Sequence, residues 1–185
     1  MRRKLAFRGQ TPVDYLKQRV LDPIGMEIGG WRLGDDGNPQ LWFGAILTAR
    51  NLAKYGELIR LNGSWNGKQI LSPELLRECF IGTEANPAYG LTWWLNRYVA
   101  PELRASIPPL SQGTQDLTDI AGIPQDLVFA AGAGNQRLYI SWSLKLVVVR
   151  QASGIMRSIT GHGRSGFSDA EFLSLLLTGK PEKGQ

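Results

Sequence analysis

Residues 127 to 151 read LVFAAGAGNQRLYISWSLKLVVVRQ, and this stretch decides the fold. Its aliphatic, aromatic and β-branched residues suit a pleated, half-buried sheet surface. Two turn signals divide it, at Gly132 to Asn135 and at Trp142 and Ser143. The stretch therefore predicts three antiparallel strands, which run from Leu127 to Ala131, from Gln136 to Ser141 and from Leu144 to Gln151. One face of such a sheet must be buried, so the rest of the chain supplies its cover.

The composition is that of a globular protein. The chain has 185 residues, of which 43% are hydrophobic and 20% charged, and no stretch approaches the roughly 20 apolar residues of a membrane span. The net charge of +5 is concentrated in Arg2, Arg3, Lys4 and Arg8. No stripe of basic residues interleaved with aromatic residues follows. We expect neither a membrane span nor a nucleic-acid partner.

The single cysteine, Cys79, and the single histidine, His162, have no metal-ligand spacing. We therefore expect no metal and no cofactor, and we interpret Cys79 as a small buried packing residue. The chain starts with a charged segment like that of a secretory signal, but the apolar region is missing, because Arg8 follows Leu5 to Phe7 directly. No signal peptide is expected, and the compartment stays unknown.

Helix signals occur at four places. A capping residue that can accept a hydrogen bond from backbone N–H groups stands at Thr11, Thr48, Ser72 and Ser168. The first helix must end before Asp22, because Pro23 disfavours helical geometry in the residue ahead of it. The second ends at Asn62 and Gly63, and the last carries a hydrophobic staple of Phe167 and Phe172.

The remaining segments predict less regular structure. Asp35 to Pro39 indicates a turn between short extended pieces, and Tyr89 to Trp94 (YGLTWW) is expected to be a strand. Pro101 to Pro124 is expected to be a long surface excursion. The predicted organisation is a basic segment at residues 1–10, one domain over residues 11–178 and a frayed tail at residues 179–185.

Four stretches, taken in order, resemble one family. They are YLKQRVLDPIGM (Tyr15 to Met26), LTARNLAKYGELIRLNGSWNGKQILSPELL (Leu47 to Leu76), YGLTWW and AAGAGNQRLYISWSLKLVVVRQ (Ala130 to Gln151). This order resembles the carboxy-terminal part of the serine β-lactamase-like hydrolases, which include class C β-lactamases, penicillin-binding proteins, esterases and amidases. The resemblance implies an incomplete α+β fold, in which an antiparallel sheet is flanked by helices and the active site lies at their junction.

The resemblance also implies acyl transfer through a serine in Ser-x-x-Lys, with a Tyr-x-Asn or Ser-x-Asn element and a Lys-Thr-Gly-like strand. A serine hydroxyl is a poor nucleophile until a base takes its proton, so the lysine stands one helical turn away. No serine of this sequence has a lysine three positions later, and no tyrosine begins Tyr-x-Asn. We therefore assign no catalytic residue in this chain.

The third family element has a counterpart here. Either Ala130, Ala131 and Gly132 or the overlapping Ala133 and Gly134 occupy the place of Lys-Thr-Gly, and both registers stay open. By the resemblance, Ala131, Gly132, Ala133 and Gly134 are candidates for the strand that binds substrate and completes the oxyanion hole. Alanines in this place favour an esterase or amidase over a β-lactamase. The alternative is that the glycines only serve a hairpin turn that needs positive φ.

Two further candidates are open to two interpretations. Trp93 and Trp94 are candidates for lining a substrate cleft, but adjacent strand residues point to opposite faces, so only one can do so. The alternative for both is core packing. His162 lies in the sequence GHGR, and no serine or cysteine motif accompanies it, so we interpret it as a loop residue.

Three hypotheses about function follow. The first is a truncated serine hydrolase, which acts on a small ester or amide in the complete enzyme and is inactive as this chain alone; complete family members can be exported. The second is a non-catalytic binding or scaffold domain that uses the sheet edge at residues 127–136. The third is that another polypeptide supplies a missing amino-terminal half.

Overall fold

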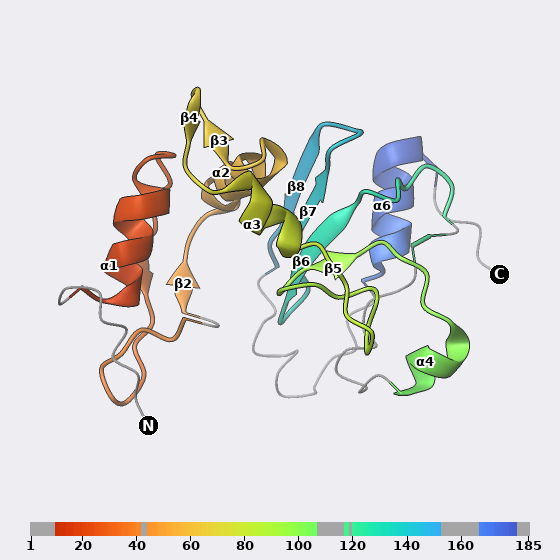
Figure 1. Ribbon diagram of the computed structural model, residues 1–185, viewed down its shortest axis with the longest axis horizontal. Coiled ribbons are helices and arrows are strands. Elements are labelled where there is room, and N and C mark those ends of the chain that lie inside the picture. Colours follow the sequence, from red (N-terminus) through yellow and green to blue (C-terminus); the bar gives the residue numbers. More distant parts are fainter. Residues whose placement is uncertain (1–9, 42–43, 107–116, 119, 153–166, 181–185) are drawn as a thin grey trace. The chain divides into compact units, whose positions relative to one another are not determined.

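The computed structural model describes residues 10–41, 44–106, 117–118, 120–152 and 167–180. The chain divides into two compact units, Met1–Pro73 and Glu74–Gln185. The amino-terminal unit contains, in chain order, α1 (Pro12–Leu16), η1 (Lys17–Leu21), β1 (Gly30–Trp31), β2 (Ala45–Ile46), α2 (Ala49–Arg60), β3 (Ser64–Trp65) and β4 (Lys68–Gln69) (Figure 1). The single domain over residues 11–178 stays a prediction.

The helices of the amino-terminal unit begin where the sequence predicts. Thr11 and Asp14 form a reciprocal capping box, because Thr11 Oγ1 accepts from the Asp14 N–H at 3.1 Å and an Asp14 oxygen accepts from the Thr11 N–H at 3.1 Å. The Thr11 hydroxyl also holds the pKa of Asp14 below its usual value. The helix continues as the π-helical turn η1 and ends at Leu21, ahead of Pro23.

A small apolar core holds this unit together. Thr48 caps α2 by accepting from the Asn51 N–H at 3.2 Å, and Leu58, near the end of α2, is fully buried. The buried residues that share this core are Val20, Leu21, Ile24, Met26 and Leu58. The short strands pair antiparallel, β1 with β2 and β3 with β4, and a bridge between Leu33 and Pro39 confirms the predicted turn.

The carboxy-terminal unit is built on one four-stranded antiparallel sheet. Its elements are α3 (Pro73–Glu78), which starts at the last residue of the amino-terminal unit, β5 (Trp94–Leu95), α4 (Pro101–Ser106), β6 (Val128–Gly132), β7 (Gln136–Ser141), β8 (Leu146–Arg150) and α6 (Asp169–Thr178). The strand order is β5-β6-β7-β8. The three predicted strands are confirmed, but their ends differ. Gly132 belongs to β6, so the first turn has only the three residues 133–135, and Leu144 and Lys145 belong to the second turn, because β8 begins at Leu146.

The predicted strand at Tyr89 to Trp94 is wrong, because this segment reverses direction. Tyr89 pairs back with Trp94, and Thr92 has a φ of 67°. The turn lies close to the end of α3, where the Leu91 N–H donates to the Cys79 carbonyl at 3.0 Å. Gly90 permits this approach, because a Cβ there would lie 2.2 Å from the Cys79 oxygen. Cys79 itself is half-buried rather than buried.

The predicted surface excursion from Pro101 to Pro124 is also wrong in part. It begins with the helix α4, and Leu117 and Ile123 are 2% and 7% exposed within the main core. Residues 107–116 and 119 lie outside the described residues. The sequence misled because the apolar residues of this segment have no helical or strand period, yet loop residues can still contribute to a core.

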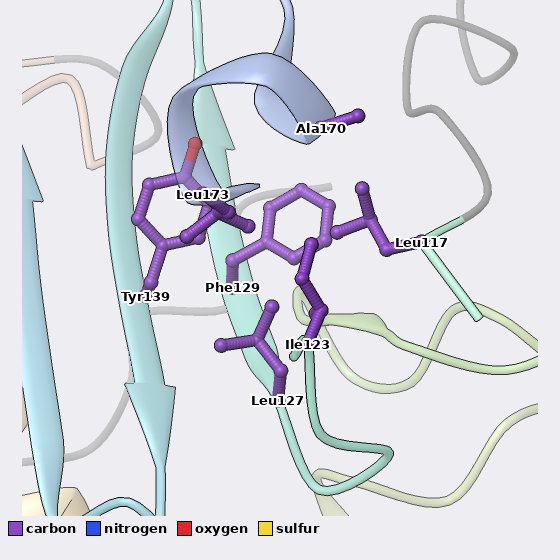
Figure 2. Packing of buried hydrophobic residues seen from close by; sticks show 7 residues of the cluster. All are labelled: Leu117, Ile123, Leu127, Phe129, Tyr139, Ala170 and Leu173. Carbon is purple, nitrogen blue, oxygen red and sulfur yellow. The ribbon is translucent and has the colours of Figure 1, made fainter. Parts of the chain in front are cut away.

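The main core lies between the sheet and α6 (Figure 2). Its buried residues are Leu117, Ile123, Leu127, Phe129, Tyr139, Ala170 and Leu173. Ser168 caps α6 by accepting from the Glu171 N–H at 3.2 Å, and the predicted staple places the rings of Phe167 and Phe172 at 5.7 Å. The cap and the staple fix where α6 begins, and the helix then directs Leu173 into the core.

Candidate substrate-binding edge

Strand β6 extends beyond the strand that covers its first half. β5 pairs with it only at Phe129 and Val128, opposite Trp94 and Leu95. On its other side β7 pairs along all of β6, from Val128 to Gly132. The last part of β6 therefore has a strand neighbour on one side alone within the described part of the chain.

The backbone direction at this open part follows from one hydrogen bond. The Asn96 N–H donates to the Leu127 carbonyl at 3.1 Å, so the backbone N–H and C=O of Leu127 point toward β5 and not toward β7. Alternate residues of an antiparallel strand direct their N–H and C=O groups to the same side, so Phe129 and Ala131 also face β5. Continuing the register places Ala131 opposite Thr92, which belongs to the turn rather than to β5. Among the described residues, no strand therefore pairs with the Ala131 N–H and C=O on this side, and we call this part of β6 the open edge.

The four predicted strand residues fall into two pairs. Ala131 and Gly132 are exposed and lie on β6, whereas Ala133 and Gly134 lie in the turn. Gly134 has a φ of 72°, so its role in the turn follows from its backbone alone. By alternation Gly132 faces β7, which leaves Ala131 as the residue whose backbone faces the open side.

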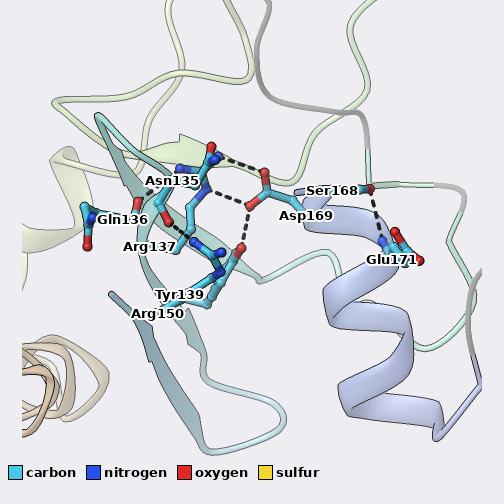
Figure 3. Close-up of polar contacts among 8 residues, drawn as sticks. All are labelled: Asn135, Gln136, Arg137, Tyr139, Arg150, Ser168, Asp169 and Glu171. Carbon is cyan, nitrogen blue, oxygen red and sulfur yellow. Dashed lines mark hydrogen bonds and ion pairs between the residues drawn. The ribbon is translucent and has the colours of Figure 1, made fainter. Parts of the chain in front are cut away.

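A buried polar cluster joins β7 to the start of α6 (Figure 3). Arg137 on β7 donates from Nε and Nη2 to the two carboxylate oxygens of Asp169, at 2.8 and 3.0 Å. Tyr139 donates its hydroxyl to the same carboxylate. The Arg137 and Asp169 side chains are only 7% and 5% exposed. A forked, desolvated ion pair of this kind fixes both partners more firmly than a surface pair.

Burial first, and then the negative charge of Asp169, raise the pKa of the Tyr139 hydroxyl far above its usual value. Tyr139 is fully buried and therefore stays protonated as a donor to Asp169. This hydroxyl is consequently a fixed structural donor and is unsuited to act as an acid or base near neutral pH.

The turn after β6 is held by two side chains, Arg150 at the end of β8 and Gln136 at the start of β7. Arg150 donates from Nη1 to the Asn135 carbonyl at 2.7 Å, and its guanidinium carbon lies 4.0 Å from the ring centroid of Phe167. The Gln136 side chain donates to the Ala152 carbonyl at 2.7 Å and accepts from the Ala152 N–H at 3.1 Å. The end of the edge is thus attached to two other segments.

The structure places the other candidates as follows. Trp93 is 6% exposed and its ring lies 5.5 Å from that of Phe80, while Trp94 is half-buried and stacks on Phe129 at 6.4 Å. Both tryptophans contribute to packing, and cleft lining stays a prediction. His162 lies outside the described residues.

The sequence interpretation missed the pairing of Arg137 with Asp169. The two residues are 32 positions apart, so no local pattern links them. One signal was available: QRLYIS places Arg137 on the same strand face as Tyr139, and a charge on a buried face requires a partner. Among the residues described, no cluster of three or more His, Cys, Asp or Glu could hold a metal ion. The helices described there include none long and apolar enough to cross a membrane.

This sheet with its flanking helices has the β-lactamase-like fold, as the comparison with solved structures shows. The structure titled "Putative 6-aminohexanoate-dimer hydrolase from Bacillus anthracis" is similar with a TM-score of 0.56 and 21% identity, over 94% of this chain and 40% of that chain. The structure titled "Crystal structure of putative beta-lactamase from Bacteroides dorei DSM 17855" has a TM-score of 0.53 and 15% identity, over 90% of this chain and 50% of that chain.

At these identities the likeness concerns the fold alone. The chain spans half or less of the length of these two structures. No family model matches the chain, and no curated protein matches it either. The comparison therefore supports the expected α+β class and leaves activity to be argued from the residues.

Proposed function

We propose that this chain contributes the substrate-binding edge of a β-lactamase-like serine hydrolase that cleaves a small ester or amide. The observation that carries the proposal is the open part of β6, where the Ala131 N–H faces away from β7 and past the end of β5. The fold similarity to two proteins titled as a hydrolase and a β-lactamase supports the same class. Ala130 and Ala131 in the Lys-Thr place favour an ester or amide over a β-lactam.

The proposed role of the edge is electrostatic. A substrate carbonyl lies against β6, and its oxygen accepts a hydrogen bond from the Ala131 N–H. When negative charge develops on that oxygen, the Ala131 N–H is one of the oxyanion-hole donors. One such donor contributes about 3 kcal/mol to transition-state stabilisation. Ala131 has no charged side chain, so recognition here uses the backbone.

The nucleophile must come from elsewhere. The sequence has no Ser-x-x-Lys and no Tyr-x-Asn, and loss of the nucleophile lowers turnover by roughly a millionfold. The loss of the nucleophile outweighs the contribution of one oxyanion-hole donor, so the chain alone is expected to be close to inactive. In the proposal an amino-terminal half carries the serine and lysine, either in a longer reading frame or in a separate polypeptide.

The reading frame gives the first test. Translation of the DNA upstream of the Met1 codon, or of neighbouring genes, is expected to yield Ser-x-x-Lys followed by Tyr-x-Asn or Ser-x-Asn within a domain's length. The complemented protein is then expected to hydrolyse a nitrophenyl ester, while the chain alone does not. Absence of both motifs from the genomic surroundings would remove the serine-hydrolase proposal.

A matched pair of variants tests the role of the edge. Ala131→Pro removes the outward N–H without removing a β7 ladder bond, and proline is tolerated at such edge positions. Ala131→Gly keeps the N–H. In the complemented protein, kcat is expected to fall about a hundredfold or more for Ala131→Pro and to change only a few-fold for Ala131→Gly. Equal activity of the two variants would contradict the proposed donor.

The second candidate function is a non-catalytic binding or scaffold domain that uses the edge at residues 127–136. The observation in its favour is that the sheet, the Ser168 cap of α6 and the main core are present in a chain without Ser-x-x-Lys and Tyr-x-Asn. It requires the purified chain to be monodisperse and to unfold cooperatively on heating. An aggregating product without a cooperative transition would count against it.

A further inference from the structure

The buried cluster is connected to the candidate edge through the sheet register. Arg137 lies directly opposite Ala131 in the β6–β7 ladder. Besides its two bonds to Asp169, Arg137 donates from Nη1 to the Gln136 carbonyl at 3.0 Å. By alternation, that carbonyl faces Gly132, the last residue of β6. One guanidinium therefore joins the first residue of α6 to the backbone pair at which the edge ends.

The cluster has the properties of a rigid anchor. Three donors, two from Arg137 and one from Tyr139, converge on the Asp169 carboxylate, which is 5% exposed. Water does not compete for these bonds, and the fork fixes the orientation of the guanidinium as well as its distance. Asp169 in turn is held at the start of α6, whose cap is Ser168.

We propose that Arg137, Asp169 and Tyr139 are positioning residues that hold the backbone of Ala131 in one orientation at the open edge. The inference rests on the proposed function only in that this function explains why a fixed Ala131 backbone is useful. The fixed orientation itself is a property of the chain without substrate. The cluster acts through the ladder and does not touch the substrate. Its contribution is preorganisation, since a donor fixed before the reaction needs no reorganisation during it.

The test measures the order of the Ala131 amide directly. In the isotopically labelled full chain, the ¹⁵N relaxation order parameter of Ala131 is expected to be about 0.85, the value of rigid backbone. Asp169→Asn, which keeps the size of the side chain and loses its charge, is expected to lower it below about 0.6. Arg137→Lys keeps the charge without the fork and is expected to have an intermediate effect, and Tyr139→Phe a smaller one.

A second carboxylate on the same sheet provides the matched control. Asp126 accepts from the Ser141 hydroxyl at 2.9 Å and from the Ser143 N–H at 2.6 Å, at the far end of β7 from Arg137. Asp126→Asn is expected to lower the stability of the chain while the order parameter of Ala131 stays unchanged. If the cluster contributed only to stability, Asp169→Asn and Asp126→Asn would lower the order parameter of the Ala131 amide by the same amount.

The outcomes separate this inference from the proposed function. An Ala131 amide that stays rigid in folded Asp169→Asn, Arg137→Lys and Tyr139→Phe overturns the positioning role. So does an equal loss of order in Asp126→Asn. If Asp169→Asn fails to fold, Arg137→Lys and Tyr139→Phe decide the question. Loss of order confined to the cluster variants supports positioning, even if the complemented protein hydrolyses no ester, in which case only the proposed function fails.

Discussion

The starts of α2 and α6 are held in different ways. In α2 the cap is local, since Thr48 accepts from the Asn51 N–H three residues away. In α6 the local cap at Ser168 is joined by the ion pair of Asp169 with Arg137, 32 residues away and buried. A local cap specifies where a helix begins, whereas the long-range pair specifies where it lies on the sheet. Substitutions at the two sites should therefore differ severalfold in cost.

The largest expected effect is at Asp169. Asp169→Ala leaves the Arg137 guanidinium buried without its partner and should lower the free energy of unfolding by about 3–5 kcal/mol. Urea unfolding monitored by amide exchange in β7 measures this. Glu171→Ala, which removes an exposed carboxylate from the same helix turn, is the control and should cost less than about 1 kcal/mol. Similar costs for both variants would show that the buried pair contributes little.

The next effect concerns the packing of α6. Leu173 is fully buried and Leu176 is 48% exposed, so the two leucines of one helix form an internal comparison. Leu173→Ala should destabilise the carboxy-terminal unit by about 2–5 kcal/mol, and Leu176→Ala by no more than about 0.5 kcal/mol. Thermal and urea unfolding of both variants test this. A reversed order would mean that the opposite face of α6 is the buried one.

A smaller effect is expected at the local cap of α2. Thr48→Ala removes the acceptor for the Asn51 N–H and should cost about 1 kcal/mol, whereas Thr48→Ser keeps the hydroxyl and should cost only a few tenths. The free energy of unfolding is measured by denaturant unfolding of the full chain, followed at residues of the amino-terminal unit. A loss for Thr48→Ala as large as that for Asp169→Ala would remove the distinction between local and long-range anchoring.

The smallest effect concerns pH and α1. The pKa of Asp14 is lowered in the folded chain by the Thr11 hydroxyl, so the cap contributes above the unfolded pKa and is lost as pH falls through the lowered folded pKa. An NMR titration of the Asp14 carboxyl should follow the loss of α1 amide shifts at acid pH. Thr11→Ala should move the Asp14 pKa back toward its usual value, and an unchanged pKa would exclude the capping box as its cause.

The sequence was a good guide wherever a signal is local. Thr11, Thr48 and Ser168 each cap the predicted helix, and the three strands of residues 127–151 have the expected order, with turns shifted by one or two residues. These elements depend on the capping hydroxyl, on the alternation of side chains and on glycine in a turn. All three act over a few residues, so they can be recognised without knowing the fold.

The candidate site was predicted only in outline. The sequence indicated Ala131 to Gly134, but the open side at Ala131 depends on where β5 ends, and β5 is two residues long because Tyr89 to Trp94 turns back on itself. Leu117 and Ile123 were missed as core residues because burial of a loop depends on tertiary contacts. The pairing of Arg137 with Asp169 depends on the same kind of contact.

The close approach of Gly90 to Cys79 limits how this protein can vary. A side chain at Gly90 would place its first carbon 2.2 Å from the Cys79 oxygen, a backbone atom that cannot turn away. A combinatorial library that randomises the turn before β5 should therefore return glycine at this position while accepting many residues at exposed Leu91. Tolerance to mutation in this loop is set by the space beside the main chain and not by distance from the candidate edge.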